Sequence, residues 1–539
     1  MEGGVIGPRT QNRDRRFARA AFIVFIALVA LRVAALWAVR YIPTQDGPSH
    51  LANAVRLREM WRPPDTPVDK LYRLNLRPNP NWGYYSLVAS LSFIVQPLVA
   101  EKIFLSLYVC GFAAAAYSLA RAAGAGEHAP IAASAALPFA FGFVFHMGFF
   151  NYAGGTVLML LAVGYFWKRR DGFKWKGVVA VDLLLIAAYF FHLMPALFGA
   201  GAVYLLNGLR VLTAADRRAA MKRAGWTWAA TAPAWGFPAY FFAVNTPAYY
   251  RRVSFVEQLQ ALARGDVLVS LGSGQAWLGY VAVVVTAAAV VWGIIGFVRG
   301  RRFEPGREAA VVFGALCVVM YFALPDTAGS GSMVTMRLRP WISVFTIVWA
   351  AAFLGRRSRF VALPVAAAFA LAALGSDFVA HRGYDRDLRA FNRGWCTVEP
   401  RATMVYIDYS PEVDRSVRVF CHAGGYYALA RDLVDFSNYE VDNSEFPVNF
   451  GAAGFRPTAA DCDYGTPYDV AYYQDVVDYI LMWKAPSGYP DVANAKKTYR
   501  LIYDAYGLKI FRIKGSYRTP GRPHHPNAVL YPTASAASR

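Results

Sequence analysis

The chain has 539 residues, of which 56% are hydrophobic and 17% are charged, and its mean hydropathy is +0.28. Soluble proteins carry about one quarter charged residues, so this composition argues against a purely water-soluble enzyme. The net charge is +21, but residues 381–539 hold 19 Lys or Arg against 18 Asp or Glu, so nearly all of the excess lies in residues 1–380. There it falls between long apolar runs, as in the cytoplasmic loops of a membrane protein. This distribution argues against nucleic acid as a partner.

The N-terminus combines a basic tail with a long apolar run. Residues 1–18 are predicted to be a cytoplasmic tail and residues 20–39 the first membrane span. A signal peptide has a similar outline, but this run is about 20 residues long, enough to cross a bilayer, and no A-x-A cleavage site follows it. We therefore expect a retained span, preceded by the basic residues Arg13, Arg15, Arg16 and Arg19.

Further apolar runs have the character of membrane spans, although some are shorter than the roughly 20 residues that cross a hydrocarbon core. Together with the first run they predict a polytopic α-helical membrane domain of about eleven helices over residues 19–380. The further runs lie near residues 103–121, 130–147, 151–167, 177–194, 196–212, 226–244, 276–298, 308–324, 341–355 and 360–380.

Charge sets the expected orientation. A cytoplasmic N-terminus places every strongly basic loop on the cytoplasmic side, as the positive-inside rule requires. We therefore interpret the apolar stretch 83–97 as an amphipathic helix at the outer interface, because a further span there would turn those loops outward. The basic loops are 121–129, 168–176, 210–225, 299–307 and 356–359. The segments left outside are 42–102, the first outer loop, with 245–275, 325–340 and 381–539.

Residues 381–514 are predicted to form a small extracytoplasmic α/β domain. Short apolar or alternating stretches predict strands at 405–408, 417–421, 477–482 and 508–513, with a helix over 426–434. Residues 515–539 are rich in Pro, Ser and Gly and are predicted to be a disordered tail.

The five cysteines exclude a disulfide-built scaffold. Cys110 and Cys317 fall within apolar runs, where cysteine serves as a small hydrophobic residue. Cys396, Cys421 and Cys462 are too far apart for a zinc C-x-x-C pattern, and whether one pair of them is oxidised stays open.

Candidate chemistry begins just after the first span, at Gln45-Asp46-Gly47-Pro48-Ser49-His50. Asp-Gly-Pro is a turn signal, and Asp46 or Ser49 could cap the helix that follows. On that helix His50 and Asn53 share one face, with Asp46 at its mouth. Two interpretations are open: Asp46 is a turn or capping residue, or it is a partly desolvated general base tuned by His50.

The order of a basic tail, one span, an outer loop that opens with an acidic residue, interfacial helices and further spans resembles the GT-C fold. It is similar to polyprenol-phosphate-sugar-dependent glycosyltransferases such as protein O-mannosyltransferases and lipid A aminoarabinose transferases. The resemblance implies that Asp46 acts on the acceptor. Many members have Glu after this Asp and a second Asp at the start of the fourth span, whereas this chain has Gly47 and Asn151. Asn151 can orient a sugar hydroxyl but cannot be a base.

The donor that the resemblance implies is an anion, so cationic side chains are expected to bind its phosphate. Arg32 lies within the first span, where a central charge costs at least ~2.5 kcal/mol on insertion scales. Arg337 and Arg339 follow a Gly/Ser-rich loop that can approach a phosphate closely. The remaining residues with an expected substrate contact are Asn53, Asn151, His146 and His192, and a structural role stays open for both histidines.

The resemblance thus implies an inverting glycosyltransferase in the plasma (inner) membrane, with Asp46 and His50 as catalytic residues. It would transfer a sugar from a polyprenyl-phosphate carrier to a hydroxyl of a glycan, lipid or protein acceptor at the outer face. No cofactor is required by this interpretation, and a divalent cation stays open. A transporter or flippase of a lipid-linked saccharide is the main alternative, although the ionisable residues at mid-membrane depth and the internal repeats expected of it are scarce here. A membrane acyltransferase or a structural assembly factor also stays open.

Overall fold

A computed structural model describes residues 8–62, 71–170, 173–245, 249–300, 303–328, 331–411, 416–451 and 477–514. The chain divides into two compact units. The helical unit comprises Met1–Ala38, Leu105–Phe145 and Asn151–Val379. The mixed unit comprises Val39–Phe104, His146–Phe150 and Ala380–Arg539.

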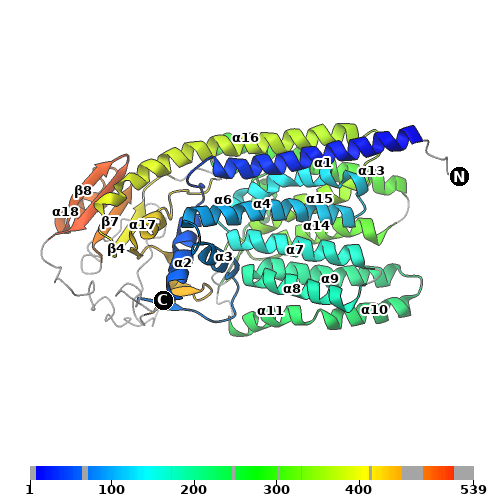
Figure 1. Ribbon diagram of the computed structural model, residues 1–539, viewed down its shortest axis with the longest axis horizontal. Helices are drawn as coiled ribbons and strands as arrows, with labels where there is room; N and C mark the ends of the chain where they lie inside the picture. The colour runs from blue at the N-terminus through cyan, green and yellow to red at the C-terminus, as the bar shows by residue number, and fades with distance from the viewer. Residues whose placement is uncertain are drawn as a thin grey trace. The chain divides into compact units, whose positions relative to one another are not determined.

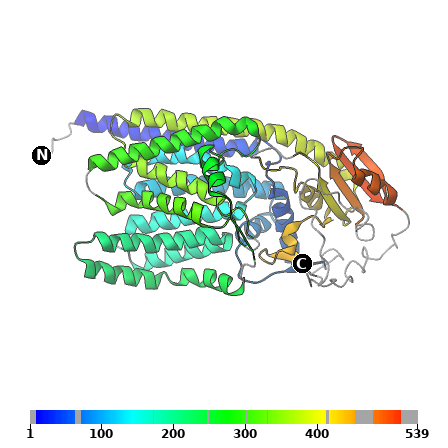
Figure 2. The same cartoon turned by 180° about the vertical axis from the view of Figure 1, so that it is seen from behind.

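The helical unit is built from long helices that run alongside one another (Figures 1 and 2). This unit also contains a short antiparallel pair of strands, β2 (Tyr250–Arg251) and β3 (Thr327–Ala328). The helices that lie wholly or largely in this unit are α1 (Pro8–Trp37), α4 (Pro97–Ala122), η2 (Gly126–His128), α5 (Ala129–Ala136), η3 (Leu137–Phe141), α6 (Phe143–His146), α7 (Phe150–Arg169), α8 (Trp175–Phe191), α9 (Leu193–Thr213), α10 (Arg217–Ala230), α11 (Pro233–Val244), α12 (Phe255–Ala263), η4 (Ser273–Gln275), α13 (Ala276–Gly300), α14 (Pro305–Ala323), η5 (Met336–Leu338), α15 (Arg339–Ala351) and α16 (Arg359–Phe391).

Each expected span corresponds to helical structure. Among the described residues, eight helical stretches are long and apolar enough to cross a membrane. Three expected spans fall outside those eight: α8 has 17 residues, α15 has 13, and the run 226–244 is divided between α10 and α11 near Pro233. The protein is an α-helical polytopic membrane protein, and the basic residues of the expected tail lie in the first turns of α1.

Burial separates the outer helices of this unit from the inner ones. On α13 apolar side chains such as Tyr280, Val284 and Val298 are exposed, which suits a lipid-facing helix. On α15 nearly every side chain is buried, including Trp341 and Trp349. An apolar helix surrounded by other helices and an apolar helix that faces outward are both expected when lipid replaces water as the solvent.

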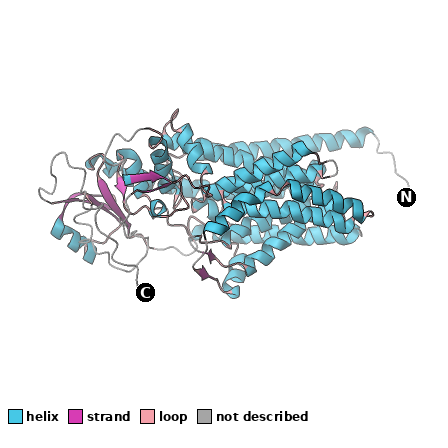
Figure 3. Ribbon diagram, turned by 90° about the horizontal axis from the view of Figure 1, so that it is seen from below, coloured by secondary structure: helices cyan, strands magenta, loops and turns pink. Residues whose placement is uncertain are grey.

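The mixed unit contains a five-stranded sheet in the order β5-β4-β7-β9-β8. The strands β4, β5 and β7 are parallel neighbours, and β9 is antiparallel to both β7 and β8. A separate antiparallel pair, β1 with β6, joins the segment between α2 and α3 to the C-terminal section. Figure 3 distinguishes the strands, in magenta, from the helices, in cyan. The elements are α2 (Gly47–Glu59), β1 (Tyr72–Leu74), α3 (Gly83–Leu91), η6 (Asn392–Thr397), β4 (Thr403–Asp408), α17 (Gly424–Arg431), β5 (Val434–Asp435), η7 (Tyr439–Asp442), β6 (Val448–Phe450), β7 (Tyr479–Trp483), α18 (Pro490–Thr498), β8 (Tyr499–Ala505) and β9 (Leu508–Ile513).

The predicted helix over 83–97 is confirmed as α3, followed by turns, and three of the four predicted strands are confirmed as β4, β7 and β9. The predicted strand at 417–421 is wrong. Its side chains are buried, as its apolar character requires, but the Arg418 N–H donates to Gln45 Oε1 at 3.0 Å and the Cys421 N–H to the Arg418 carbonyl at 2.9 Å. The segment therefore turns upon itself. The expected disordered tail, 515–539, and Cys462 lie outside the described residues.

Candidate functional site

Asp46 stands at the N-terminus of α2, which begins at Gly47-Pro48. Proline suits a first helical turn because its missing N–H would have no partner there. Asp46 occupies the N-cap position, but its side chain makes no capping hydrogen bond and is only 4% exposed. The carboxylate is therefore buried but does not make the hydrogen bond by which an N-cap aspartate usually stabilises its helix.

The backbone of the chain holds Asp46 in place. The N–H groups of Gln45 and Asp46 donate to the carbonyls of His146 and Met147, at 2.9 and 3.0 Å. Gly148 follows with φ of +91°, and a Cβ there would lie 2.7 Å from the Gly47 nitrogen and 3.1 Å from the Asp46 Cβ. Both the backbone conformation and the close approach call for glycine at position 148. Residues 101 positions apart in the sequence thus fix the Asp46 loop.

The Asp46 carboxylate is only partly neutralised by its surroundings. Its Oδ1 lies 3.6 Å from His422 Nε2, and the side chains of Gln45 and Tyr439 hydrogen-bond to it. Burial lowers the pKa of His422 to about 4, so this imidazole is uncharged at neutral pH. Burial raises the pKa of Asp46 to about 7, against an opposing attraction to His50. A carboxyl group with this pKa can exchange a proton near neutral pH.

His50 lies one turn along α2 and meets a buried carboxylate. Its Nδ1 is 2.8 Å from Glu440 Oε1 and 2.6 Å from the Tyr85 hydroxyl, which donates in turn to Glu440 Oε2. Burial alone would lower the pKa of His50, but the charge and hydrogen bond of Glu440 outweigh it and raise that pKa. His50 and Glu440 are therefore placed to form an ion pair when the imidazole is protonated.

Asn53 extends the same face of α2, which confirms the predicted alignment of His50 with Asn53. The Asn53 amide donates to Glu440 Oε2 at 2.8 Å and accepts from Asn438 Nδ2 at 2.8 Å. We call the set of buried polar residues joined in this way the Asp46 cluster: Asp46, His50, Asn53, Tyr85, His422 and Glu440.

Sequence reasoning missed Tyr85, His422 and Glu440. Tyr85 lies on α3, whose apolar character pointed only to the membrane interface. His422 adjoins Cys421, which is disulfide-bonded, whereas Cys396 is free. Glu440 lies in the short helix η7, capped by the Asn438 side chain, which accepts from the Glu440 N–H at 3.2 Å. Glu440 is one of several glutamates in the polar C-terminal section, and no local motif distinguishes it from Glu445.

His146 lies against a second histidine. Its Nε2 is 3.0 Å from His381 Nε2, and both rings are buried. Together with its carbonyl, which accepts from Gln45, the side chain anchors the segment that supports Asp46. Among the described residues no three His, Cys, Asp or Glu side chains gather as a metal site would require.

Within the helical unit, Arg337 and His192 form a separate polar group. Arg337 Nη1 lies 3.0 Å from His192 Nε2, and the Arg337 carbonyl accepts from the Tyr152 hydroxyl. The Met194 N–H donates to His192 Nδ1 at 3.1 Å. A guanidinium only donates, and a neutral imidazole has one accepting nitrogen, so His192 can accept from Arg337 or from Met194 but not from both. The Arg337 guanidinium is the cation of this group and suits an anion.

Arg339 and Arg32, the other predicted phosphate contacts, are both buried. Arg339 opens α15 with its guanidinium 5.5 Å from the centre of the Tyr321 ring. Arg32 donates to Asp377 Oδ2 at 2.6 Å, and Gln275 donates to the other oxygen of that carboxylate at 3.1 Å. Asp377 balances the charge of Arg32, so we leave Arg32 out of the phosphate contacts considered below.

Two further polar residues lie on helices of the helical unit. Asn151, in the first turn of α7, is buried. Asp182, on α8, has an Oδ1 without a hydrogen-bond partner among the described residues.

A solved structure is similar to this chain over nearly its whole length. The crystal structure of ArnT from Cupriavidus metallidurans in the apo state matches with a TM-score of 0.52 at 12% sequence identity, covering 92% of this chain and 98% of that chain. No family model matches the sequence, and no curated protein sequence matches it. Identity this low makes the likeness one of fold. ArnT is a lipid A aminoarabinose transferase of the GT-C type, and the present chain has a GT-C fold.

Proposed function

We propose that the protein is a membrane glycosyltransferase that moves a sugar from a polyprenyl-phosphate carrier to an acceptor hydroxyl at the outer face of the plasma membrane. The observation that carries the proposal is the buried Asp46 carboxylate, which caps no helix and has a pKa raised to about 7. The GT-C fold supports the same class of reaction. No metal or other cofactor enters the proposed steps.

Asp46 would act as the general base. Its carboxylate takes the proton of the acceptor hydroxyl while the acceptor oxygen forms a bond to the anomeric carbon. The bond from that carbon to the phosphate oxygen breaks, and polyprenyl phosphate departs with the electron pair. Attack opposite to the leaving group inverts the anomeric configuration. His50, whose pKa is raised by Glu440, would favour the ionised form of Asp46 when the imidazole is protonated.

Arg337 would bind the phosphate of the donor. A phosphate oxygen accepts from a guanidinium, and Arg337 supplies one beside His192. Arg339, at the start of α15, adds a second cation next to a helix N-terminus. We expect Arg337→Gln to weaken donor binding, measured with polyprenyl-phosphate sugar, and to leave the KM for the acceptor unchanged.

The outer-face location also has support from the described residues. Cys421 is disulfide-bonded, and disulfides persist in oxidising compartments. Its neighbour His422 lies next to Asp46, so the same compartment would contain the Asp46 cluster. The basic loops of the sequence favour a cytoplasmic N-terminus.

The test is the amount of labelled polyprenyl-phosphate sugar in cells that carry Asp46→Asn, compared with wild type and with a deletion. We expect the variant to be inserted at normal levels and to accumulate unused donor as the deletion does. Asp216→Asn is the matched control, because Asp216 is an N-cap whose side chain does cap its helix, accepting from the Ala219 N–H at 3.0 Å. Asparagine caps as well as aspartate, so this control should behave as wild type. Wild-type donor levels in Asp46→Asn would overturn the proposal and favour the transporter alternative.

A further inference from the structure

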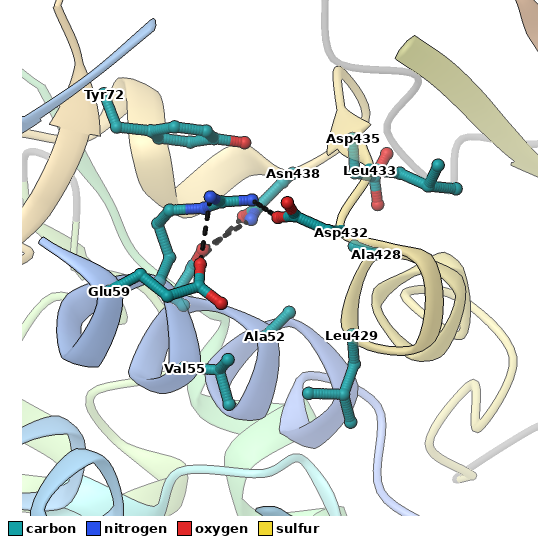
Figure 4. Close-up of a pocket in the computed structure, with 12 residues that line it drawn as sticks. Ala52, Val55, Glu59, Tyr72, Ala428, Leu429, Asp432, Leu433, Asp435 and Asn438 are labelled. Atoms are coloured by element: carbon teal, nitrogen blue, oxygen red, sulfur yellow. Dashed lines mark hydrogen bonds and ion pairs between the residues drawn. The ribbon is translucent and has the colours of Figure 1, made fainter. Parts of the chain in front are cut away.

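A small pocket lies between α2 and α17, within the mixed unit (Figure 4). The two helices touch at one end, where a Cβ on Gly425 would lie 2.5 Å from the Pro48 carbonyl. One turn further along, the facing residues Ala52 and Ala428 are too small to fill the space. We call this the α2–α17 pocket, and it is lined by Ala52, Asn53, Val55, Arg56, Glu59, Tyr72, Ala428, Leu429, Asp432, Leu433, Asp435 and Asn438.

The lining combines an apolar floor with polar groups of several kinds. Val55, Leu429 and Leu433 supply apolar surface, and amide, carboxylate and hydroxyl groups lie around it. Figure 4 shows the Tyr72 hydroxyl pointing over the pocket towards Asn438. A sugar ring has the complementary surface, because its hydroxyls both donate and accept while its C–H faces are apolar.

The charges of the pocket exclude an anionic ligand. Arg56 is paired with Asp432 at 2.6 Å and with Glu59 at 3.0 Å, and its guanidinium lies 4.8 Å from the centre of the Tyr72 ring. Three carboxylates, counting Asp435, thus face one guanidinium that is already engaged. A phosphate would meet net negative charge there, whereas an uncharged or amine-bearing sugar would not.

The pocket adjoins the Asp46 cluster through one pair of amides. Asn53 and Asn438 line the pocket and bond to each other, with Asn438 donating to Asn53 at 2.8 Å. The same Asn53 amide donates to Glu440 at 2.8 Å, and Glu440 pairs with His50. A single layer of side chains therefore separates a ligand in the pocket from the residues that we propose act on the acceptor.

We infer that the α2–α17 pocket is a saccharide subsite that holds an uncharged or amine-bearing sugar of the acceptor. The assignment of this sugar to the acceptor rests on the proposed function, because the charge of the pocket excludes the anionic donor. The binding of a sugar in the pocket does not rest on the proposed function. The pocket selects acceptors that carry a sugar unit next to the reacting hydroxyl.

The test uses the full chain in detergent and saturation-transfer NMR with four probes: methyl α-mannoside, N-acetylglucosamine, glucosamine and glucose 6-phosphate. We expect a saturation-transfer signal for at least one of the first three probes and no signal for glucose 6-phosphate. Ala428→Phe fills the pocket and should weaken binding on the order of tenfold or more, equivalent to the loss of about 1.4 kcal/mol. Ala430→Phe is the matched control, because Ala430 lies on the same helix but is exposed and does not line the pocket.

Tyr72→Phe gives a second measurement that adds no bulk. It removes only the hydroxyl that points over the pocket, and we expect a smaller loss of binding than with Ala428→Phe. No transfer to any of the three sugars, equal binding by Ala428→Phe and Ala430→Phe, or binding of glucose 6-phosphate as strong as that of glucosamine would each overturn the inference.

The outcome separates this inference from the proposed function. Asp46→Asn should keep the sugar signal, because Asp46 does not line the pocket. If Asp46→Asn still transfers sugar, the proposed function fails and the subsite stands. If Ala428→Phe keeps both the sugar signal and the wild-type KM for the acceptor, the subsite fails and the proposed function stands.

Discussion

Each unit of the molecule buries a charged group, and the two groups differ in how completely their charges are balanced. In the helical unit, Arg32 faces Asp377, and Gln275 satisfies the second carboxylate oxygen. In the mixed unit, two carboxylates, Asp46 and Glu440, have as a cationic partner only the raised-pKa His50 of the two histidines in the Asp46 cluster, because burial lowers the pKa of His422 to about 4. A buried ion pair whose charges balance, such as Arg32 with Asp377, suits a structural role. A set with more carboxylates than cations, such as the Asp46 cluster, leaves a carboxylate able to exchange a proton. This difference is the reason that we propose the Asp46 cluster, and not the Arg32–Asp377 pair, as the functional site.

The largest effect is expected when the Arg32–Asp377 ion pair is broken. Arg32→Leu leaves Asp377 buried without its counter-ion, and removing one partner of a buried pair typically costs about 3–5 kcal/mol. We expect a marked fall in the thermal midpoint of the detergent-solubilised protein. The double variant Arg32→Leu with Asp377→Leu should recover most of that midpoint. A single variant as stable as wild type would contradict the structural role given to the pair.

The next largest effect is expected from removing the charge of Glu440 in the Asp46 cluster. Glu440→Gln keeps the shape and the amide contact but removes the charge that raises the pKa of His50. We expect kcat to fall by about 10²-fold, at the lower end of general acid–base contributions. The pKa of His50, followed by NMR, should fall, and the alkaline limb of the pH–rate profile should move to lower pH with it. An unchanged profile would show that Glu440 only packs against its neighbours.

The dependence of activity on pH tests Asp46 itself. The pKa of Asp46 is raised to about 7, and the proposed base is the ionised form. The rate should therefore rise with pH up to about 7, roughly tenfold per unit below that value, before it falls as His50 loses its proton. The measurement is kcat/KM for transfer between pH 5 and 9. An acid limb near pH 4 would mean that Asp46 has the pKa of a solvent-exposed carboxyl group.

The smallest effect concerns the loop that carries Asp46. Gly148→Ala forces a Cβ against Gly47 and Asp46, and we expect a loss of severalfold in kcat. The matched control is Gly124→Ala, because Gly124 has a φ of +90° and nothing within 4 Å of its added Cβ. Both substitutions strain the backbone at a cost of about 1–2 kcal/mol, but only the first disturbs the loop. Equal losses of kcat in the two variants would assign the effect to strain alone.

The sequence predicted those parts of the fold and the cluster that depend on local patterns. Apolar runs located the helices, and a 3.6-residue period placed His50 beside Asn53 on one face of α2. Contacts between distant segments could not be predicted in this way. Glu440 is 387 positions from Asn53, and Asp377 is 345 positions from Arg32. Nothing in either local sequence specifies its partner, so Arg32 was expected at a phosphate and Glu440 was overlooked.

The segment 417–421 shows a different limit of sequence reasoning. Its alternating apolar residues predicted a strand, and the residues are indeed buried. The backbone N–H of Arg418 instead bonds to the side chain of Gln45, a partner supplied by the first outer loop. Periodicity reports which side chains are buried, but the partner of a backbone hydrogen bond depends on the tertiary fold.

The Asp46 loop is held by the peptide carbonyls of His146 and Met147, which every amino acid at those positions would also present. The side chain at position 147 can therefore change without removing the hydrogen bonds that position the carboxylate, whereas the His146 side chain also anchors the segment through His381. Evolution, or an engineer, could vary residue 147 to alter the surroundings of the base while the base itself keeps its position. Gly148 allows no such freedom, because a Cβ there would meet the backbone of Gly47.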